Sequence, residues 1–205
     1  HTTVIQKKSN TNVLFRRQLD STVYCSEFQW KGTAQVYDLG NHSYEITPSS
    51  KSTTFELGCL FSEKLAESQL PDFSETVANS KHHFKEFWES GAAVDFSECT
   101  DPRAFELERR VILSQYLTKI QCTGSLPPQE TGLTMNSWHG KFHMEMLWWH
   151  VAHYIQWGRA ELMEKQLQFY FTAFEKAKAT AAFQGYKGAR WQKMTDPSGN
   201  ESPST

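Results

Sequence analysis

Three features that often reveal the class of a protein are missing from this 205-residue chain. No apolar run reaches the roughly 18 residues that a membrane-spanning helix needs, so we expect no membrane insertion. Lysine and arginine form no cluster, and 21 basic against 23 acidic residues leave a net charge of −2, which gives a nucleic-acid partner no electrostatic support. The cysteines lack CxxC or CxxH spacing, which argues against zinc and against a dense disulfide framework. We expect free, buried thiols at Cys25, Cys59, Cys99 and Cys122.

The sequence does contain a large share of aromatic residues. Its 39% hydrophobic and 21% charged residues are typical of a globular chain. Seven tryptophans stand among 14% aromatics. Flat rings pack well on the apolar C–H faces of sugars, so this excess suits a glycan site, and a large aromatic core explains it equally well.

Residues 1–70 are expected to form a portion of an antiparallel β-sandwich. Apolar and polar residues alternate over 33–39, 43–47 and 53–61, and turn residues separate these stretches at 31–32 and 40–41. Short strands at this spacing are typical of a sandwich.

The period of the apolar residues becomes helical from Asp72 onward. Residues 72–90 follow a capping box made by Asp72 and Glu75, and residues 92–96 indicate a short return strand, so we interpret 71–100 as a helical linker. The next helix opens with Asp101 as N-cap and Pro102 in the first helical position. Its predicted apolar stripe contains Leu107, Val111, Leu117 and Ile120.

Residues 101–205 are expected to start an (α/α) barrel. The stretch 142–157 is apolar nearly all round, which predicts a helix covered on most sides. The stretch 161–183 is an ordinary amphipathic pattern that Gly185 ends. A buried helix followed by a half-exposed one is the alternation of inner and outer helices in such a barrel.

Polar residues gather where the predicted inner helix begins, and they are Trp138, His139, Lys141, His143 and Glu145. Charged groups entering an apolar helix are costly unless they are paired or bind a ligand. A clamp for sugar hydroxyls is the favoured interpretation, and a hydrogen-bonded pair of core histidines is the alternative. His139 and His143 have the i, i+4 spacing of metal ligands, but Lys141 lies between them and no HExxH motif is present, so we predict no metal.

A second candidate segment runs from Arg190 to Glu201. Arg190 and Trp191 are either a capping charge with a packing ring or a ring platform with a bidentate hydroxyl donor. Glu201 lies in a loop rich in proline and glycine, where it is either a solvated charge or a catalytic carboxylate at the barrel mouth.

In this order, the two segments resemble motifs of glycoside hydrolase family 65 and its (α/α)6-barrel relatives. The stretch Phe-His-Met-Glu145 is similar to the family's Trp-Asp-Thr-Glu, and Gly185-Tyr-Lys-Gly-Ala-Arg-Trp191 followed by Gly-Asn-Glu201 is similar to Gly-Tyr-x-Gly-Ala-x-aromatic-Pro-Trp followed by Gly-x-Glu. Bacterial six-hairpin glycosidases resemble the chain over residues 84–205. The stretches that carry this likeness are 100–103, 113–116 and 127–143.

The resemblance implies a periplasmic or secreted glycosidase without a cofactor, acting on an oligo- or polysaccharide with inversion. A carboxylic acid protonates the leaving oxygen while a base-activated water attacks the opposite face. Trp138 and Trp191 would be stacking platforms, and Glu201 the best carboxylate candidate. The hydroxyl ligands would be His139, Lys141, His143, Glu145 and Arg190.

Two departures from the family pattern limit this interpretation. Phe142-His143 stands where the family has Trp-Asp, so specificity for glucose does not transfer. The family's general acid lies much further beyond the first motif than Thr205 does, so we expect an incomplete piece whose partner is the remainder of the barrel.

Four other classes stay open at this point. A non-catalytic glycan-binding protein would keep the tryptophans, and a glycoside phosphorylase would replace the attacking water with phosphate. A polysaccharide lyase or epimerase needs a base beside cations that neutralise a uronate, and His139, Lys141 and Arg190 could serve. A helical structural protein would pack the Trp138 and Trp191 segments without a cleft.

Overall fold

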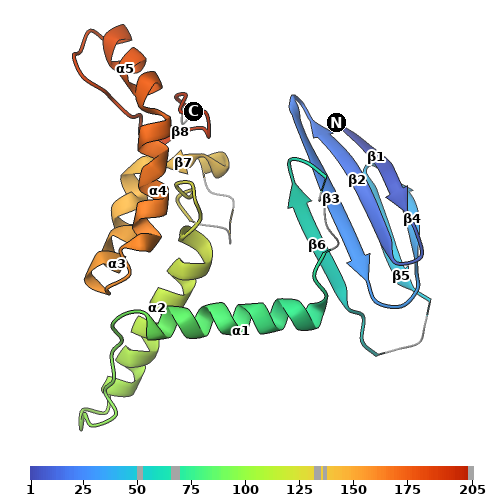
Figure 1. Ribbon diagram of the computed structural model, residues 1–205, viewed down its shortest axis with the longest axis horizontal. Coiled ribbons are helices and arrows are strands. Elements are labelled where there is room, and N and C mark those ends of the chain that lie inside the picture. The colour runs from blue at the N-terminus through green and yellow to red at the C-terminus, as the bar shows by residue number, and fades with distance from the viewer. Residues whose placement is uncertain (50–52, 66–69, 132–134, 136–137, 203–205) are drawn as a thin grey trace. The chain divides into compact units, whose positions relative to one another are not determined.

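A computed structural model of the chain describes residues 1–49, 53–65, 70–131, 135 and 138–202 (Figure 1). It divides the chain into two units, His1–Phe84 and Lys85–Thr205. An antiparallel β region is followed by helices, as the sequence predicts. The boundary between the units falls inside a helix and not at the end of the predicted sandwich portion.

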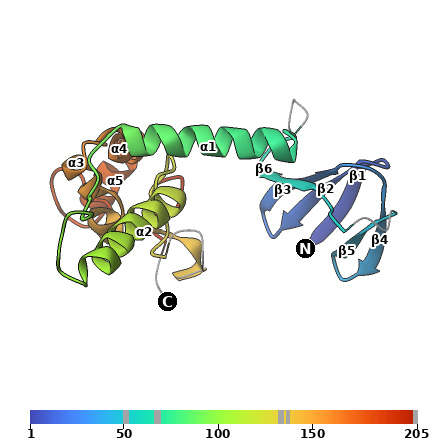
Figure 2. The ribbon, with the colours of Figure 1, turned by 90° about the horizontal axis from the view of Figure 1, so that it is seen from below.

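The first unit contains a four-stranded antiparallel sheet and a separate hairpin. The sheet has the order β1-β2-β3-β6, and the hairpin pairs β4 with β5 (Figures 1 and 2). The strands are β1 (Thr2–Lys8), β2 (Asn12–Leu19), β3 (Thr22–Trp30), β4 (Ala34–Gly40), β5 (Ser43–Pro48) and β6 (Leu57–Ser62). The last three overlap the three stretches where alternation predicts strands, and each ends one residue beyond its stretch.

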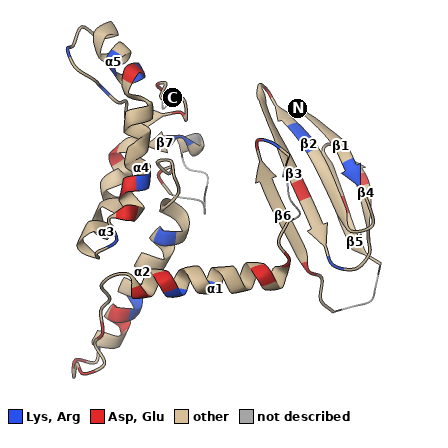
Figure 3. Ribbon diagram, in the orientation of Figure 1, with Lys and Arg blue, Asp and Glu red and all other residues tan. Residues whose placement is uncertain are grey.

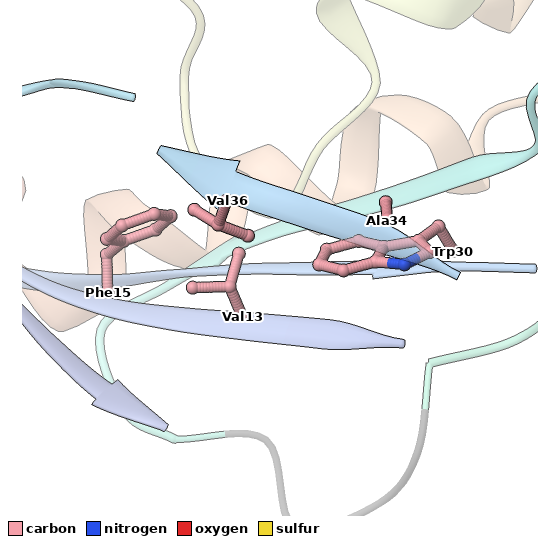
Figure 4. Close-up of a cluster of buried hydrophobic side chains, with 5 residues drawn as sticks. All are labelled: Val13, Phe15, Trp30, Ala34 and Val36. Atoms are coloured by element: carbon pink, nitrogen blue, oxygen red, sulfur yellow. The ribbon is translucent and has the colours of Figure 1, made fainter. Parts of the chain in front are cut away.

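The core of this unit lies between the sheet and the hairpin. Val13, Phe15 and Trp30 come from β2 and β3, and they pack against Ala34 and Val36 of β4 (Figure 4). The Trp30 indole N–H donates a hydrogen bond of 2.7 Å to the Asn10 carbonyl oxygen, so the one polar atom of this ring is satisfied. Alternation places these side chains on one face of each layer, and the two β layers bury them together.

Helix α1 (Phe73–Glu89) begins with the predicted capping box. The Glu75 amide donates to Asp72 Oδ1 at 2.8 Å, and the Asp72 amide donates to Glu75 Oε2 at 2.9 Å. The predicted return strand at 92–96 is wrong, since no strand forms there. The Ala92 amide donates to the Trp157 carbonyl oxygen at 2.9 Å and the Phe96 amide to the Glu108 carboxylate at 2.7 Å, so neither amide is available to a neighbouring strand.

Helix α2 (Ala104–Cys122) starts two residues later than predicted. Asp101 Oδ1 accepts from the Arg103 amide at 2.9 Å, within a turn that precedes the helix. The predicted apolar stripe is not the packed face: Leu107, Leu117 and Ile120 are 52%, 40% and 42% exposed. The buried residues are instead Ala104, Gln115 and Cys122, and the Gln115 side chain accepts a hydrogen bond from Arg159.

The expected inner helix over 142–157 is wrong as a continuous helix. It is divided into strand β7 (Phe142–His143), a 3-10 turn (Met144–Met146), a π-helical turn (Trp148–Ala152) and helix α3 (His153–Gln156). The amides of His143 and Met144 donate to the carbonyl oxygens of Pro128 and Lys193, at 3.2 and 2.8 Å, so they are withdrawn from helical bonding.

Burial within this stretch also differs from the expected pattern. His150, Val151 and Tyr154 face inward, whereas Trp148 and Trp149 are 73% and 64% exposed. The two tryptophans are therefore not the core of an inner helix. The π-helical turn changes the angular spacing of the side chains, which a 3.6-residue period could not anticipate.

The predicted helix over 161–183 is two helices, α4 (Glu161–Thr172) and α5 (Phe174–Phe183), with a break at Ala173. Gly185 ends α5 as predicted, with φ +80°. The Tyr186 amide donates to the Ala181 carbonyl oxygen at 2.8 Å, and the Gly185 amide donates to that of Ala182 at 3.0 Å. This pair of bonds is a Schellman motif.

The remaining surface findings concern charge, membrane and thiols. Acidic and basic residues are interspersed along α2 and α4 (Figure 3). No helix in the described part of the chain is both long and apolar enough to cross a membrane. All four thiols are free; Cys25 and Cys122 are buried as expected, but Cys59 and Cys99 are exposed.

Candidate functional site

The structure brings together the two segments selected from the sequence. Strand β7 pairs with β8 (Met194–Thr195), so that Phe142 lies opposite Thr195 and His143 opposite Met194 (Figure 1). A further bridge joins Thr195 to Glu201. The β7–β8 pairing therefore places the side chains that follow His143 beside those that precede Met194.

His143 forms the buried floor of this cluster. It is 2% exposed, and its Nε2 lies 3.0 Å from Glu145 Oε1. Its Nδ1 lies 3.8 Å from Glu130 Oε2 and makes no hydrogen bond within the described part of the chain. Because a carboxylate can only accept, the geometry assigns the Nε2 proton to His143, which then donates to Glu145.

Glu145 and Lys193 form the rim above His143. The Lys193 ammonium lies 3.2 Å from Glu145 Oε1, the same oxygen that faces His143, and both side chains are about half exposed. The pKa of Glu145 lies below the ordinary glutamic acid value. The hydrogen bond from Lys193 is the largest cause, and the hydrogen bond from His143 is the second. Glu145 is therefore an ionised acceptor held in place through one of its two oxygens.

Trp138 stands beside this rim in an unusual backbone conformation. It is 46% exposed, and its φ is +50°, in the left-handed region that bulky residues rarely adopt. Its ring meets His143 edge-on, with centroids 6.2 Å apart, and the Lys193 ammonium lies 5.9 Å from the ring centroid. A strained residue of this kind costs about 1–3 kcal/mol and is common at ligand sites.

The loop before the cluster is held by a second histidine. His150 is 6% exposed, and its Nε2 lies 2.8 Å from the Glu130 carbonyl oxygen. Burial lowers the pKa of His150, so the ring is neutral near pH 7 and Nε2 donates to the carbonyl. Together with the bond from His143 to Pro128, this contact fixes residues 128–130 against the cluster.

Trp191 and Arg190 are placed outside the cluster. The Trp191 ring packs on Tyr170 and Phe174, with centroid distances of 5.5 and 6.1 Å. The Arg190 guanidinium lies 5.4 Å from the Tyr186 ring centroid. These ring contacts favour the packing alternative over a sugar platform.

The remaining predicted site residues are Glu201, Lys141 and His139, which lie on the segments that form the cluster. Glu201 is exposed, and its main chain pairs with Thr195. Lys141 is half-buried, and its amide donates to the Trp138 carbonyl oxygen at 3.4 Å. His139 belongs to the 3-10 turn Trp138–Gly140, and its side chain lies outside the described part of the structure.

Sequence reasoning missed Glu130 and Lys193. Each lies in a stretch that carries the family resemblance or adjoins it, but neither belongs to a periodic pattern. Their places depend on the β7–β8 pairing and on the bond from His143 to Pro128, and two-residue strands leave no alternation to detect. For Lys193, its position two residues after Trp191, inside the second candidate segment, is the signal in the sequence that could have identified it.

Comparison with models of protein families, with curated proteins and with solved structures gives no match. Within the described ranges, no three His, Cys, Asp or Glu side chains lie close enough together to hold a metal ion.

Proposed function

We propose that this chain supplies part of the substrate-binding site of an inverting glycoside hydrolase that acts on an oligo- or polysaccharide. Its second unit would then be the opening helices of an (α/α)6 barrel. The single observation that carries the proposal is the β7–β8 pairing, which places an exposed, strained Trp138 beside Glu145, Lys193 and the buried His143.

The cluster has the parts that sugar recognition needs. A half-exposed indole offers a flat apolar face for the C–H face of a pyranose. Charged donors and acceptors form strong hydrogen bonds with hydroxyl groups, and Glu145 and Lys193 supply one of each at the rim. The buried His143 holds Glu145 in a fixed orientation, which lowers the entropy lost on binding.

The electrostatics of Glu145 argue against one catalytic role. A general acid needs a raised pKa so that it carries its proton near pH 7, whereas the pKa of Glu145 is lowered. We therefore assign Glu145 to binding and not to protonation of the leaving oxygen. Glu201 stays the carboxylate candidate of the described residues, and the general acid would come from the remainder of the barrel.

Among the alternatives, charge disfavours a lyase or an epimerase. These enzymes bind uronates, and the two carboxylates that lie beside His143, those of Glu130 and Glu145, would repel a uronate. Arg190, which such an enzyme would use, lies over Tyr186. A non-catalytic glycan-binding protein fits the same geometry and differs only in lacking turnover.

A binding screen with neutral and uronate-containing oligosaccharides tests the proposal. We expect the chain to bind neutral glycans and to lose binding in Trp138→Ala and Glu145→Gln. Matched controls are Trp148→Ala and Glu175→Gln, whose side chains are highly exposed and lie outside the cluster. Undiminished binding in both site variants would reject the site, and preference for uronates would favour the lyase class.

Turnover separates a hydrolase from its relatives. Proton NMR of the first product formed from a bound oligosaccharide by the complete enzyme shows the anomer released. An inverted reducing sugar formed without phosphate supports hydrolysis, a requirement for phosphate indicates a phosphorylase, and binding without product indicates a glycan-binding protein.

A further inference from the structure

Lys193 is the one charged group of the rim that sequence reasoning did not select, and its surroundings leave it able to bind a ligand. Its ammonium lies 3.2 Å from Glu145 Oε1. It also lies over the Trp138 ring, 5.9 Å from the ring centroid. Its main-chain carbonyl accepts from the Met144 amide at 2.8 Å, which fixes the start of the side chain. The lysine is 54% exposed, so the ammonium remains open to solvent.

The hydrogen-bonding capacity of the pair is only partly used. Glu145 Oε1 accepts from both His143 and Lys193. Both of these contacts are made at Oε1, and the Glu145 side chain is 52% exposed. An ammonium has three donors, and one of the three points to Oε1. An acceptor and at least one donor are therefore left side by side at the solvent-exposed rim.

This arrangement matches two adjacent hydroxyl groups. A hydroxyl both donates and accepts, and neighbouring hydroxyl oxygens on a pyranose ring are separated by about the length of a hydrogen bond. One hydroxyl can donate to Glu145 Oε2 while its neighbour accepts from Lys193 Nζ, with the ring resting on Trp138. A carboxylate in place of either hydroxyl would meet Glu145 with like charge, and Glu130 adds a second negative group nearby.

We propose that Lys193 is a specificity-determining residue that binds, together with Glu145, two adjacent hydroxyl groups of a neutral pyranose stacked on Trp138. This inference rests on the proposed function, because it names the part of the sugar that the same site recognises. It assigns to Lys193 a direct contact with the ligand and not only the support of Glu145.

The experiment uses the 205-residue chain and a panel of methyl glycosides of glucose, galactose and mannose, titrated by tryptophan fluorescence and saturation-transfer NMR. The tightest-binding glycoside is then compared with its monodeoxy analogues. Lys193→Met keeps the aliphatic stem and removes the donors. Lys187→Met, an exposed lysine of the same unit, is the matched control. Circular dichroism of each variant verifies the fold.

We expect Lys193→Met to weaken binding of the parent glycoside by roughly 10-fold or more, as for the loss of a charge-assisted hydrogen bond, and Lys187→Met to leave it unchanged. The deoxy analogue that lacks the hydroxyl bound by Lys193 should bind weakly to the unmodified protein. It should lose no further affinity in Lys193→Met.

Each other outcome counts against the inference. If no glycoside binds the unmodified protein, the proposed function and this inference both fail. If Trp138→Ala abolishes binding but Lys193→Met does not reduce it, the sugar site stands and the role of Lys193 fails. If Lys193→Met weakens the parent and every deoxy analogue equally, Lys193 acts through Glu145 and does not touch the sugar.

Discussion

Arg159 is fully buried against Phe87, with its guanidinium carbon 4.3 Å from the ring centroid and its Nε donating to the Phe87 carbonyl oxygen at 2.9 Å. Its Nη1 also donates to the Ala92 carbonyl oxygen at 3.2 Å and to Gln115 Oε1 at 3.0 Å. One side chain thus joins the end of α1, the segment after it and the middle of α2. These contacts form the framework of the second unit.

We predict that Arg159→Met destabilises the second unit by about 3 kcal/mol or more, because it leaves two buried acceptors and one part-buried acceptor without their donor. Urea unfolding followed by tryptophan fluorescence measures the loss, since six of the seven tryptophans belong to residues 85–205. Arg103→Met is the control, because its side chain is 87% exposed and we expect almost no change. Equal stabilities of the two variants would contradict the role of Arg159.

Gly91 is predicted to tolerate no side chain. A Cβ at this position would clash with the Trp157 carbonyl oxygen and lie 2.9 Å from Cγ of Arg159. We expect Gly91→Ala to cost about 1–3 kcal/mol, as for overpacking of a buried contact. Gly124→Ala is the matched control, because nothing lies within 4 Å of its Cβ position. Thermal unfolding of both variants measures the difference. Equal unfolding temperatures of Gly91→Ala and the unmodified protein would contradict a tight contact between Gly91 and Arg159.

The second unit is predicted to lose stability as the solution becomes acidic. Burial is the largest cause that lowers the pKa of both His150 and His153. A folded-state pKa below the unfolded one means that the unfolded chain binds more protons, so this stability is present above the ordinary histidine pKa and is lost as pH falls below it. Urea unfolding between about pH 7 and 5 should show this slope.

His150→Asn isolates the contribution of that ring, because asparagine cannot titrate. We expect a smaller loss of stability on acidification in His150→Asn than in the unmodified protein. His42→Asn, in the exposed turn of the β4–β5 hairpin, should keep the original slope. A slope unchanged by His150→Asn would mean that His150 titrates normally in the folded state.

The carboxyl group of Glu145 is predicted to titrate at lower pH than an ordinary glutamic acid. Hydrogen bonds from Lys193 and His143 favour its ionised form, so the interaction is complete above the ordinary pKa and disappears as pH falls through the lowered one. Carbon-13 NMR of the glutamate carboxyl carbons measures the titration. Lys193→Met should raise the pKa of Glu145, and no change would show that the two side chains do not interact in solution.

The local chemistry of the sequence predicted the ends of elements better than their packing. The capping box at Asp72, the helix stop at Gly185 and the strands expected over 33–39 and 43–47 depend on neighbouring residues. The structure confirms the box and the stop, and it confirms both strands to within one residue at each end. The prediction of a continuous helix over 142–157 was wrong, because the amides of His143 and Met144 donate to carbonyl oxygens of residues distant in sequence.

The sequence also predicted only those residues of the candidate site that have a local signal. His143 and Glu145 were identified because a charge entering an apolar stretch is visible in the sequence. Glu130 and Lys193 were not, since the His143–Pro128 hydrogen bond brings Glu130 near and the pairing of His143 with Met194 brings Lys193 near. The exposure of Trp148 and Trp149 was not predicted, because hydrophobicity alone cannot show which face a π-helical turn buries.

The most direct test of the sugar site is the dissociation constant of the tightest-binding neutral oligosaccharide, measured for the unmodified chain, Trp138→Ala and Trp148→Ala. Loss of the stacking ring should weaken binding by roughly 10-fold or more in Trp138→Ala, as for removal of an aromatic hot spot, and leave it unchanged in Trp148→Ala. Equal affinities of all three proteins would contradict a sugar site at the β7–β8 pairing.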